Sequence, residues 1–327
     1  MRFQVINYKS TERIKCASMY SFIVNPYAGC GKGMKIWKAI ARYLVSHSIE
    51  YEVVLTEGPG DAKRAAARLT EAVGEPGYII TVGGDGTMNE VLDGVSFHAP
   101  LSLGYIPAGS GNDLARGLGL PKSAVKCLKK QLTPGHFTMI DYGVLSYGAQ
   151  EPCHRRFLVS AGIGYDAAVC QEALTSRCRS RLSRLGLGRL SYMALGIRQF
   201  FKLSSSKGYI LLDGVKKVEF NNILFISCHI QPSEGGGFHF APRADGSDGK
   251  LNICVVSHRA RIKLIPILLS AFTGRRGSRT RGIRSYECRE ISIHTEAALP
   301  VHTDGESCGL QNDIQVGCVA RKVRMMV

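Results

Sequence analysis

Short apolar runs alternate with amphipathic stretches through the first 137 residues of the chain. Four runs have the length and β-branched content of buried strands: Tyr20–Val24, Tyr51–Leu55, Tyr78–Val82 and Leu101–Ile106. Between them apolar residues recur at helical spacing, in an amphipathic stretch that ends near Ser46 and a charged stretch from about Asp61 to Val73. The connections are too long for hairpins, so the pattern predicts a parallel sheet covered by helices.

The pattern changes after residue 137 to alternating runs separated by turn residues. These runs are MIDYGVLSY, RRFLVSAGIG, GYILLDG, VKKVEFNNILFISCHI, GKLNICVVS, CREISIHT and IQVGCVA. Short strands of this kind are typical of an antiparallel sandwich or barrel-like domain, here interrupted by helical patterns at about 166–203 and 260–272. The fold class predicted is therefore α/β plus β-rich.

The predicted domains follow from this change of pattern. Residues 19–137 form a three-layer α/β domain and residues 138–310 an antiparallel β-sandwich domain, with the last run, 311–327, available to return to the first domain as a strand. Residues 1–18 are polar and aperiodic. We interpret them as a dispensable extension before a functional start near Met19.

Composition suits a two-domain globular protein. The chain has 327 residues, 45% of them hydrophobic, and no apolar run approaches the roughly 18 residues of a membrane span. The N-terminal residues lack the apolar core of a signal peptide, so we expect a cytoplasmic protein. The 11 cysteines are scattered, which fits reduced, buried thiols better than a metal knuckle or a disulfide framework.

Positive charge is concentrated in the second half of the chain. The net charge is +16, and two segments, 177–207 and 259–284, each contain eight basic residues and no acid. They could face anionic lipid, nucleic acid or phosphate substrates, or could simply be solvated. The first segment intersperses arginine with leucine, which is typical of an interfacial amphipathic helix, whereas neither segment has the aromatic platforms of a nucleic-acid binder.

The stretch YIITVGGDGTMNEVLDG, residues 78–94, carries the first chemical signal. A strand, a glycine turn and a helix follow one another, with Thr87 as the predicted N-cap and Glu90 completing a capping box. Glycines allow close approach and a helix N-terminus offers free N–H groups, so the turn is a candidate phosphate seat. Asp85 inside this seat would repel phosphate unless a cation intervenes or the carboxylate takes part in proton transfer.

Three glycine-rich loops, at 25–33, 83–87 and 107–113, each follow an apolar strand. In an open parallel sheet such loops lie at the same carboxyl edge, so we expect all three to line one crevice. The first loop is not a Walker A motif, because Gly33 follows Lys32 where Ser or Thr is required.

Six motifs occur in a fixed order: NPYAGCGKG, GGDGTMNEVLDG, PAGSGNDLAR, AGIGYDA, APRADGSDGKLNI and TDGE. In order and spacing the chain from Met19 onward resembles the diacylglycerol kinase catalytic-domain family, which includes bacterial soluble lipid kinases and is related to sphingosine and ceramide kinases. The resemblance implies an ATP-binding domain similar to those of NAD kinase and phosphofructokinase, and a β-rich lipid domain, with ATP and lipid meeting in the cleft between them.

The resemblance also implies roles for individual residues of the first domain. Asp85 becomes the candidate general base or metal-linked carboxylate, and Arg116 a substrate contact. ATP, with Mg²⁺, would be held by Asn25, Lys32, Gly83, Gly84, Gly86, Thr87, Asn89, Gly109, Ser110 and Asn112.

In the second domain the resemblance points to three further sites, each with a plainer alternative. Asp166 would contact the polar head of the lipid, or could be a helix N-cap. Asp304 and Glu306 would be catalytic or metal-binding acids, although a hairpin turn would explain Asp304 with the glycine that follows it. Asp245 and Asp248 would hold a structural Mg²⁺, or belong to a polar turn.

The leading hypothesis is an ATP- and Mg²⁺-dependent kinase that phosphorylates a lipid hydroxyl, with diacylglycerol first among the substrates. It would associate peripherally with the inner face of the membrane, through anionic phospholipid and the two basic segments, and would bind no nucleic acid. The alternatives are a sphingoid, ceramide or other lipid kinase, an NAD kinase, which shares the GGDGT signature, and a non-catalytic binder of anionic membranes. The oligomeric state stays open.

Overall fold

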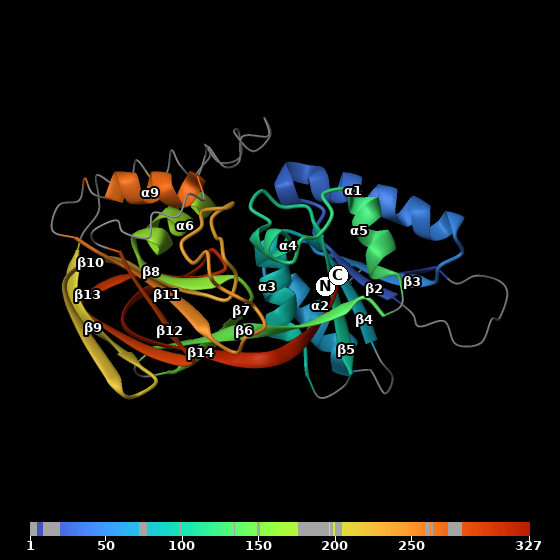
Figure 1. Ribbon diagram of the computed structural model, residues 1–327. Coiled ribbons are helices and arrows are strands. Elements are labelled where there is room, and N and C mark those ends of the chain that lie inside the picture. Colours follow the sequence, from blue (N-terminus) through green and yellow to red (C-terminus); the bar gives the residue numbers. More distant parts are fainter. Residues whose placement is uncertain are drawn as a thin grey trace. The chain divides into compact units, whose positions relative to one another are not determined.

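The computed structural model (Figure 1) describes residues 5–8, 20–71, 77–97, 100–133, 135–148, 151–175, 205–258, 264–273 and 283–327, with the single residues 196, 199 and 262. The chain forms two compact units. Unit 1 comprises Met1–Ile140 and Lys322–Val327, and unit 2 comprises Asp141–Arg321. The sequence placed the boundary at residue 137 and offered 311–327 as the returning strand, whereas only 322–327 belong to unit 1.

Unit 1 is an α/β domain, as predicted. Its parallel strands lie in the order β3, β2, β4, β5, and Met325 near the end of β14 pairs parallel to Leu103 of β5. These strands are β2 (Tyr20–Val24), β3 (Tyr51–Leu55), β4 (Gly77–Gly83), β5 (Leu101–Pro107) and the last part of β14 (Glu306–Met326). The helices are α1 (Ala28–Ser46), α2 (Asp61–Glu71), α3 (Asp85–Gly94), α4 (Asp113–Gly117) and α5 (Ala124–Gln131).

The N-terminal residues contain a strand that the sequence analysis missed. Strand β1 (Val5–Tyr8) pairs antiparallel with β3, from Val5 opposite Val54 to Tyr8 opposite Tyr51. The sequence analysis did not predict this strand, because a strand of four residues is too short to show a period. That this segment is dispensable stays a prediction.

Unit 2 is built almost entirely from antiparallel strands. Its central order is β13, β8, β10, β11, β12, and β9 pairs with both β10 and β13. The strands are β6 (Phe137–Tyr147), β7 (Cys153–Phe157), β8 (Ser160–Gly164), β9 (Ser206–Leu212), β10 (Lys216–His229), β11 (Leu251–Ser257), β12 (Ile283–Cys288), β13 (Glu290–Thr303) and the first part of β14. The predicted β-rich class is confirmed.

Two helices, α6 (Tyr165–Thr175) and α9 (Leu264–Thr273), accompany these strands. Apart from residues 196 and 199, the stretch 177–203 of the first basic segment lies outside the described residues. So do seven of the eight basic residues of the second segment, of which only Arg284 is described. Among the described helices, none is both long and apolar enough to cross a bilayer.

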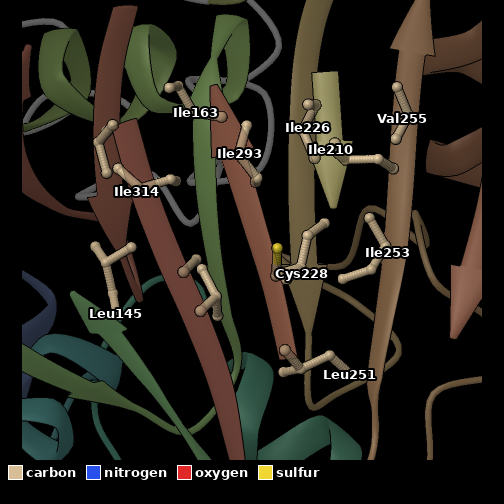
Figure 2. Packing of buried hydrophobic residues seen from close by; sticks show 14 of the residues in the cluster. Leu145, Ile163, Ile210, Ile226, Cys228, Leu251, Ile253, Val255, Ile293 and Ile314 are labelled. Atoms are coloured by element: carbon tan, nitrogen blue, oxygen red, sulfur yellow. The ribbon is translucent and has the colours of Figure 1, made fainter. Parts of the chain in front are cut away.

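Alternation along the central strands divides the side chains of unit 2 between two faces. Ile163 of β8 pairs with Ile226 of β10, and both enter a large apolar core (Figure 2). Phe225, next to Ile226 in β10, points to the opposite face of the sheet. There it packs with Tyr165 of α6 and Ile267 of α9 in a second apolar cluster. The fold therefore sets aside one face of the sheet for the helices.

Candidate functional site

Hydrogen bonds tie the three glycine-rich loops of unit 1 to one another. Asn25 donates from its backbone N–H to the Val82 carbonyl at 2.9 Å and from Nδ2 to Thr87 Oγ1 at 3.1 Å. The N–H of Ala108 donates to the Gly83 carbonyl at 2.6 Å. The loops expected to line one crevice are thus in direct contact.

Glycine is required where these loops touch. A Cβ on Gly109 would lie 2.6 Å from the Cα of Gly84, and one on Gly29 would lie 2.3 Å from the carbonyl oxygen of Ala108. Gly29 also has a φ of +57°, which side chains rarely adopt. Backbone therefore packs directly on backbone where the loops meet.

Asp85 begins helix α3 and faces the third loop. Its Oδ2 accepts the N–H of Asp113 at 3.1 Å, while Oδ1 accepts the N–H of Leu114 at 3.3 Å and lies 3.3 Å from the Tyr105 hydroxyl. The first N–H groups of α4 thus offset the negative charge. This explains how an aspartate can occupy a loop suited to phosphate.

The predicted capping box is wrong. The N-cap of α3 is Gly84, with no side-chain cap, and Thr87 instead accepts the hydrogen bond from Asn25. The carboxylate of Glu90 accepts the N–H groups of Gly60 at 2.9 Å and Ala62 at 3.2 Å. Glu90 therefore caps α2, a neighbour in space, rather than its own helix.

The third loop is held by its own polar side chains. Asn112 has a left-handed backbone, with φ +54°, and donates from Nδ2 to the Gly109 carbonyl at 2.9 Å. Arg116, expected to contact the substrate, forms an ion pair with Asp113 and donates to the Gly111 carbonyl at 3.0 Å. In this arrangement Arg116 stabilises the loop.

The other predicted nucleotide ligands differ in exposure. Asn89 is buried, Gly86 and Ser110 are half-buried, and Lys32 is exposed. Tyr105, which is fully buried and lies near Asp85 and Asn112, was not predicted, because nothing in a buried strand marks one tyrosine as part of a site.

Unit 2 holds a buried polar cluster on the helix-covered face. Asp166 in the first turn of α6, Glu234 in the loop after β10 and His302 in β13 are all buried, and their ligand atoms lie within 4.8 Å of one another. His302 Nε2 lies 3.4 Å from Asp166 Oδ2, and Asp166 Oδ1 accepts the N–H of Ala167 at 2.8 Å. Of these three, the sequence predicted only Asp166.

A second histidine lies beside this cluster. His229 Nε2 is 2.9 Å from Ser227 Oγ and 3.9 Å from Glu234 Oε2. Burial lowers the pKa of His229 to about 3, with a further contribution from the neighbouring His302, so this imidazole is neutral at physiological pH. For His302 burial also lowers the pKa, but the hydrogen bond and charge of Asp166, with the charges of Glu234 and Asp304, outweigh it and raise the pKa above its usual value.

Asp304 and Gly305 form the hairpin turn between β13 and β14, with φ of +46° and +87°. The Asp304 carboxylate accepts the N–H groups of Leu158 at 2.9 Å, Val159 at 2.9 Å and Ser160 at 3.0 Å. The turn therefore accounts for Asp304, as the alternative interpretation proposed. Glu306 begins β14 directly after the turn and is half-buried.

The carboxylates of Asp245 and Asp248 are exposed and close their own turns. Asp245 Oδ1 accepts the N–H of Ser247 at 3.0 Å, and Asp248 Oδ1 accepts the N–H of Lys250 at 2.9 Å. Within the described parts of the chain, the group of acids and histidines close enough to share an ion is the cluster of Asp166, Glu234 and His302. The loop is thus a polar turn in this structure, and the structural Mg²⁺ at Asp245 and Asp248 stays a prediction.

Comparison with known proteins gives matches along both units. Residues 19–145 match the family model described as the diacylglycerol kinase catalytic domain, and residues 159–326 match the YegS C-terminal NAD kinase beta sandwich-like domain. The diacylglycerol kinase of Mycobacterium tuberculosis is 28% identical over 304 residues, 92% of this chain and 93% of the relative. The diacylglycerol kinase of Bacillus subtilis is 27% identical over 292 residues, 88% of this chain and 89% of the relative.

A solved structure supports the same fold. A diacylglycerol kinase of Bacillus anthracis superposes with a TM-score of 0.67 at 20% identity, covering 96% of this chain and 98% of that one.

Proposed function

The chain belongs to the diacylglycerol kinase catalytic-domain family of lipid kinases, and from this premise we propose that it transfers the γ-phosphoryl group of ATP to the hydroxyl of diacylglycerol, forming phosphatidic acid. The observation that carries the proposal is the seat formed by the three glycine-rich loops around Asp85. Such a seat suits a triphosphate donor, because phosphoryl transfer depends mainly on positioning and charge stabilisation.

On the donor side, backbone N–H groups of the second and third loops would bind the phosphates of ATP, with Lys32, Ser110 and Asn112 supporting the nucleotide. The close backbone packing of Gly84 on Gly109 supports this, because a Cβ on Gly109 would lie 2.6 Å from the Cα of Gly84 and would push the two loops apart. Mg²⁺, when bound, would neutralise the phosphate charge, and Asp85 is the carboxylate of this seat that could hold it directly or through water.

On the acceptor side, we assign Asp85 the role of receiving the hydroxyl proton. Two backbone N–H groups orient its carboxylate, so its oxygens are already positioned when a hydroxyl approaches. Asp166 would bind the polar head of the lipid. Glu306 remains the alternative base, whereas Asp304 lies in the two-residue turn and its carboxylate holds that turn to the residues that lead into β8.

Membrane association, at the inner face of the membrane, is the third part of the proposal. On and beside α9 three apolar side chains are exposed at helical spacing: Ile262 by 66%, Ile265 by 45% and Leu269 by 54%. Helix α9 itself contains no charged residue, while basic residues of the segment 259–284 flank it on both sides. An exposed apolar face between cationic flanks fits the interface of an anionic bilayer.

A lipid-panel kinase assay tests the activity. The protein is incubated with labelled ATP, Mg²⁺ and mixed micelles of diacylglycerol, a sphingoid base or ceramide, with NAD as a separate soluble acceptor. We expect label in phosphatidic acid. Label only in another lipid would replace the substrate, and label only in NAD, or in no acceptor, would reject the lipid kinase.

Vesicle binding tests the membrane component separately. With vesicles rich in phosphatidylglycerol, the double substitution Ile265→Ser and Leu269→Ser should weaken binding about tenfold or more, because each side chain loses an apolar contact of roughly 1 kcal/mol. The control is Val215→Ser, an apolar residue that is 87% exposed in the β9–β10 turn. Equal binding by both variants would reject α9 as the docking element.

A further inference from the structure

We propose that His302 is a positioning residue for acceptor binding: the turn at Asp304 and Gly305 fixes its imidazole, and the imidazole in turn fixes the carboxylate of Asp166. The inference rests on the proposed function in one respect, since it takes Asp166 as the group that binds the polar head of the lipid. It gives a chemical role to a histidine and to a turn that the phosphoryl-transfer scheme does not use.

The first step is the attachment of the turn to the sheet. Asp304 accepts three backbone N–H groups from the residues that lead into β8, and its own N–H donates to the Ser160 carbonyl at 2.8 Å. Four hydrogen bonds therefore hold one residue of a two-residue turn. Gly305, the next residue of the turn, is therefore held in place by the attachment of Asp304 to the start of β8.

The second step is the orientation of the imidazole. The N–H of Gly305 points at His302 Nδ1 at 3.2 Å, so Nδ1 must be the acceptor and the neutral ring carries its proton on Nε2. Nε2 faces Asp166 Oδ2 at 3.4 Å, and the other oxygen of Asp166 accepts the N–H of Ala167. Each carboxylate oxygen thus has one donor, which leaves Asp166 a single orientation.

The third step is the space in which the two side chains meet. Gly162 of β8 lies directly opposite His302 of β13 in the register. A Cβ on Gly162 would lie 1.9 Å from Asp166 Oδ2 and 2.8 Å from His302 Nε2. The glycine in AGIG therefore makes room for this contact.

A metal ion is the obvious alternative for two carboxylates and one imidazole so close together. Coordination through Nε2 would require the remaining proton of the neutral ring on Nδ1. That position already faces the N–H of Gly305, and two donors cannot share one hydrogen bond. The tautomer that the turn selects favours a proton, rather than a metal, between His302 and Asp166.

The protonation of His302 should therefore matter for lipid binding. The groups that face it are Asp166 from α6, Glu234 from the loop after β10, Asp304 from the turn and the neutral His229 from β10. A second proton would have to enter at Nδ1 and would displace the N–H of Gly305. We expect the KM for lipid to rise as the pH falls through the pKa of His302, with the KM for ATP unchanged.

The kinetic experiment compares His302→Leu with His302→Gln. Leucine removes the donor to Asp166, so the KM for lipid should rise about 10- to 100-fold, the cost of a lost hydrogen bond to a charged group. Glutamine can place an N–H near the position of Nε2, so its KM for lipid should stay within about threefold of the wild type, and the acid-side rise should disappear because glutamine does not titrate.

The matched controls are His294→Leu and His294→Gln, on the same strand, where the histidine pairs with the exposed Asp313. These variants should leave both KM values unchanged. A His302→Leu enzyme with unaltered KM for lipid, or with equal increases for lipid and ATP, would overturn the proposal. So would an acid-side rise that survives in His302→Gln.

A titration that needs no substrate separates this inference from the proposed function. The imidazole signal of His302 is followed by NMR against pH in the wild type and in Asp166→Asn and Glu234→Gln. Each substitution should lower the pKa of His302, because it removes a negative charge that favours the imidazolium. If no lipid is phosphorylated, the proposed function fails while the titration still decides the coupling; if Asp166→Asn leaves the titration unchanged, the coupling itself is refuted.

Discussion

Replacing Asp304 by asparagine distinguishes a structural acid from a catalytic one. The substitution keeps the size of the side chain and suits the left-handed backbone, since asparagine tolerates a positive φ. It removes the charge and puts an N–H₂ group where one oxygen now accepts a backbone N–H. The folded structure can then retain the hydrogen bonds from Val159 and Ser160 to the remaining oxygen. The N–H of Leu158, however, would face the NH₂ group, which is also a donor.

The expected cost follows from this count of bonds. A hydrogen bond to a charged group contributes about 1.5–3 kcal/mol, and an unsatisfied buried donor costs about 1–3 kcal/mol. Leu158, Val159 and Ser160, whose N–H groups are involved, are all buried. We therefore expect Asp304→Asn to reduce the free energy of unfolding by about 2–4 kcal/mol, and to retain catalysis wherever the protein remains folded.

The assay is urea unfolding followed by circular dichroism, with kinase activity measured well below the transition. A matched control exists in the turn between β9 and β10, where Asp213 precedes Gly214 and accepts the N–H groups of Arg289 at 2.8 Å and Glu290 at 3.0 Å. Because Asp213 is exposed, Asp213→Asn should cost less stability. If Asp304→Asn unfolds at the wild-type urea concentration yet shows no phosphoryl transfer, the structural interpretation is refuted.

Three further predictions concern the phosphate seat and the buried histidine. Asp85→Asn should reduce phosphoryl transfer by about 10²- to 10⁴-fold while ATP affinity, measured by calorimetry, changes little; retained turnover would exclude Asp85 as the base. Gly109→Ala should weaken ATP binding, because its Cβ would lie 2.6 Å from the Cα of Gly84, whereas Gly58→Ala, which meets no atom within 4 Å, should not. Because the pKa of His229 is about 3 in the folded protein and 6.5 without the fold, its contribution to stability should be full above pH 6.5 and fall by roughly 1.4 kcal/mol per pH unit between pH 6.5 and about 3. Chemical unfolding at several pH values checks this. The substitution His229→Asn should remove roughly 1.4 kcal/mol per pH unit, the contribution of one proton, from the dependence of the free energy of unfolding on pH.

The sequence alone predicted the loops, strands and turns that require particular residue types at neighbouring positions. The glycine loops were visible because glycine is required where Gly84 and Gly109 touch, and the strands before them were visible as apolar runs. The Asp-Gly pair at 304 was recognisable as a turn for a similar reason. These features depend on residues that are neighbours in the chain.

The failures concern partners that only the tertiary structure supplies. Thr87 and Glu90 have the spacing of a capping box, but Glu90 lies beside the N-terminus of α2 and caps that helix instead. Glu234 and His302 belong to no local motif, and strand register alone brings His302 opposite Gly162. A sequence read residue by residue does not contain that register.

The return of the chain to unit 1 has a consequence for how the protein is made. Val323, Met325 and Met326 are fully buried in unit 1, and the N–H of Val327 donates to the His136 carbonyl at 3.1 Å. On the ribosome, unit 1 therefore lacks part of its core until residues 322–327 have been translated, although most of it is synthesised first. A stop codon just before residue 322 would therefore damage unit 1, although the whole of unit 2 had already been made.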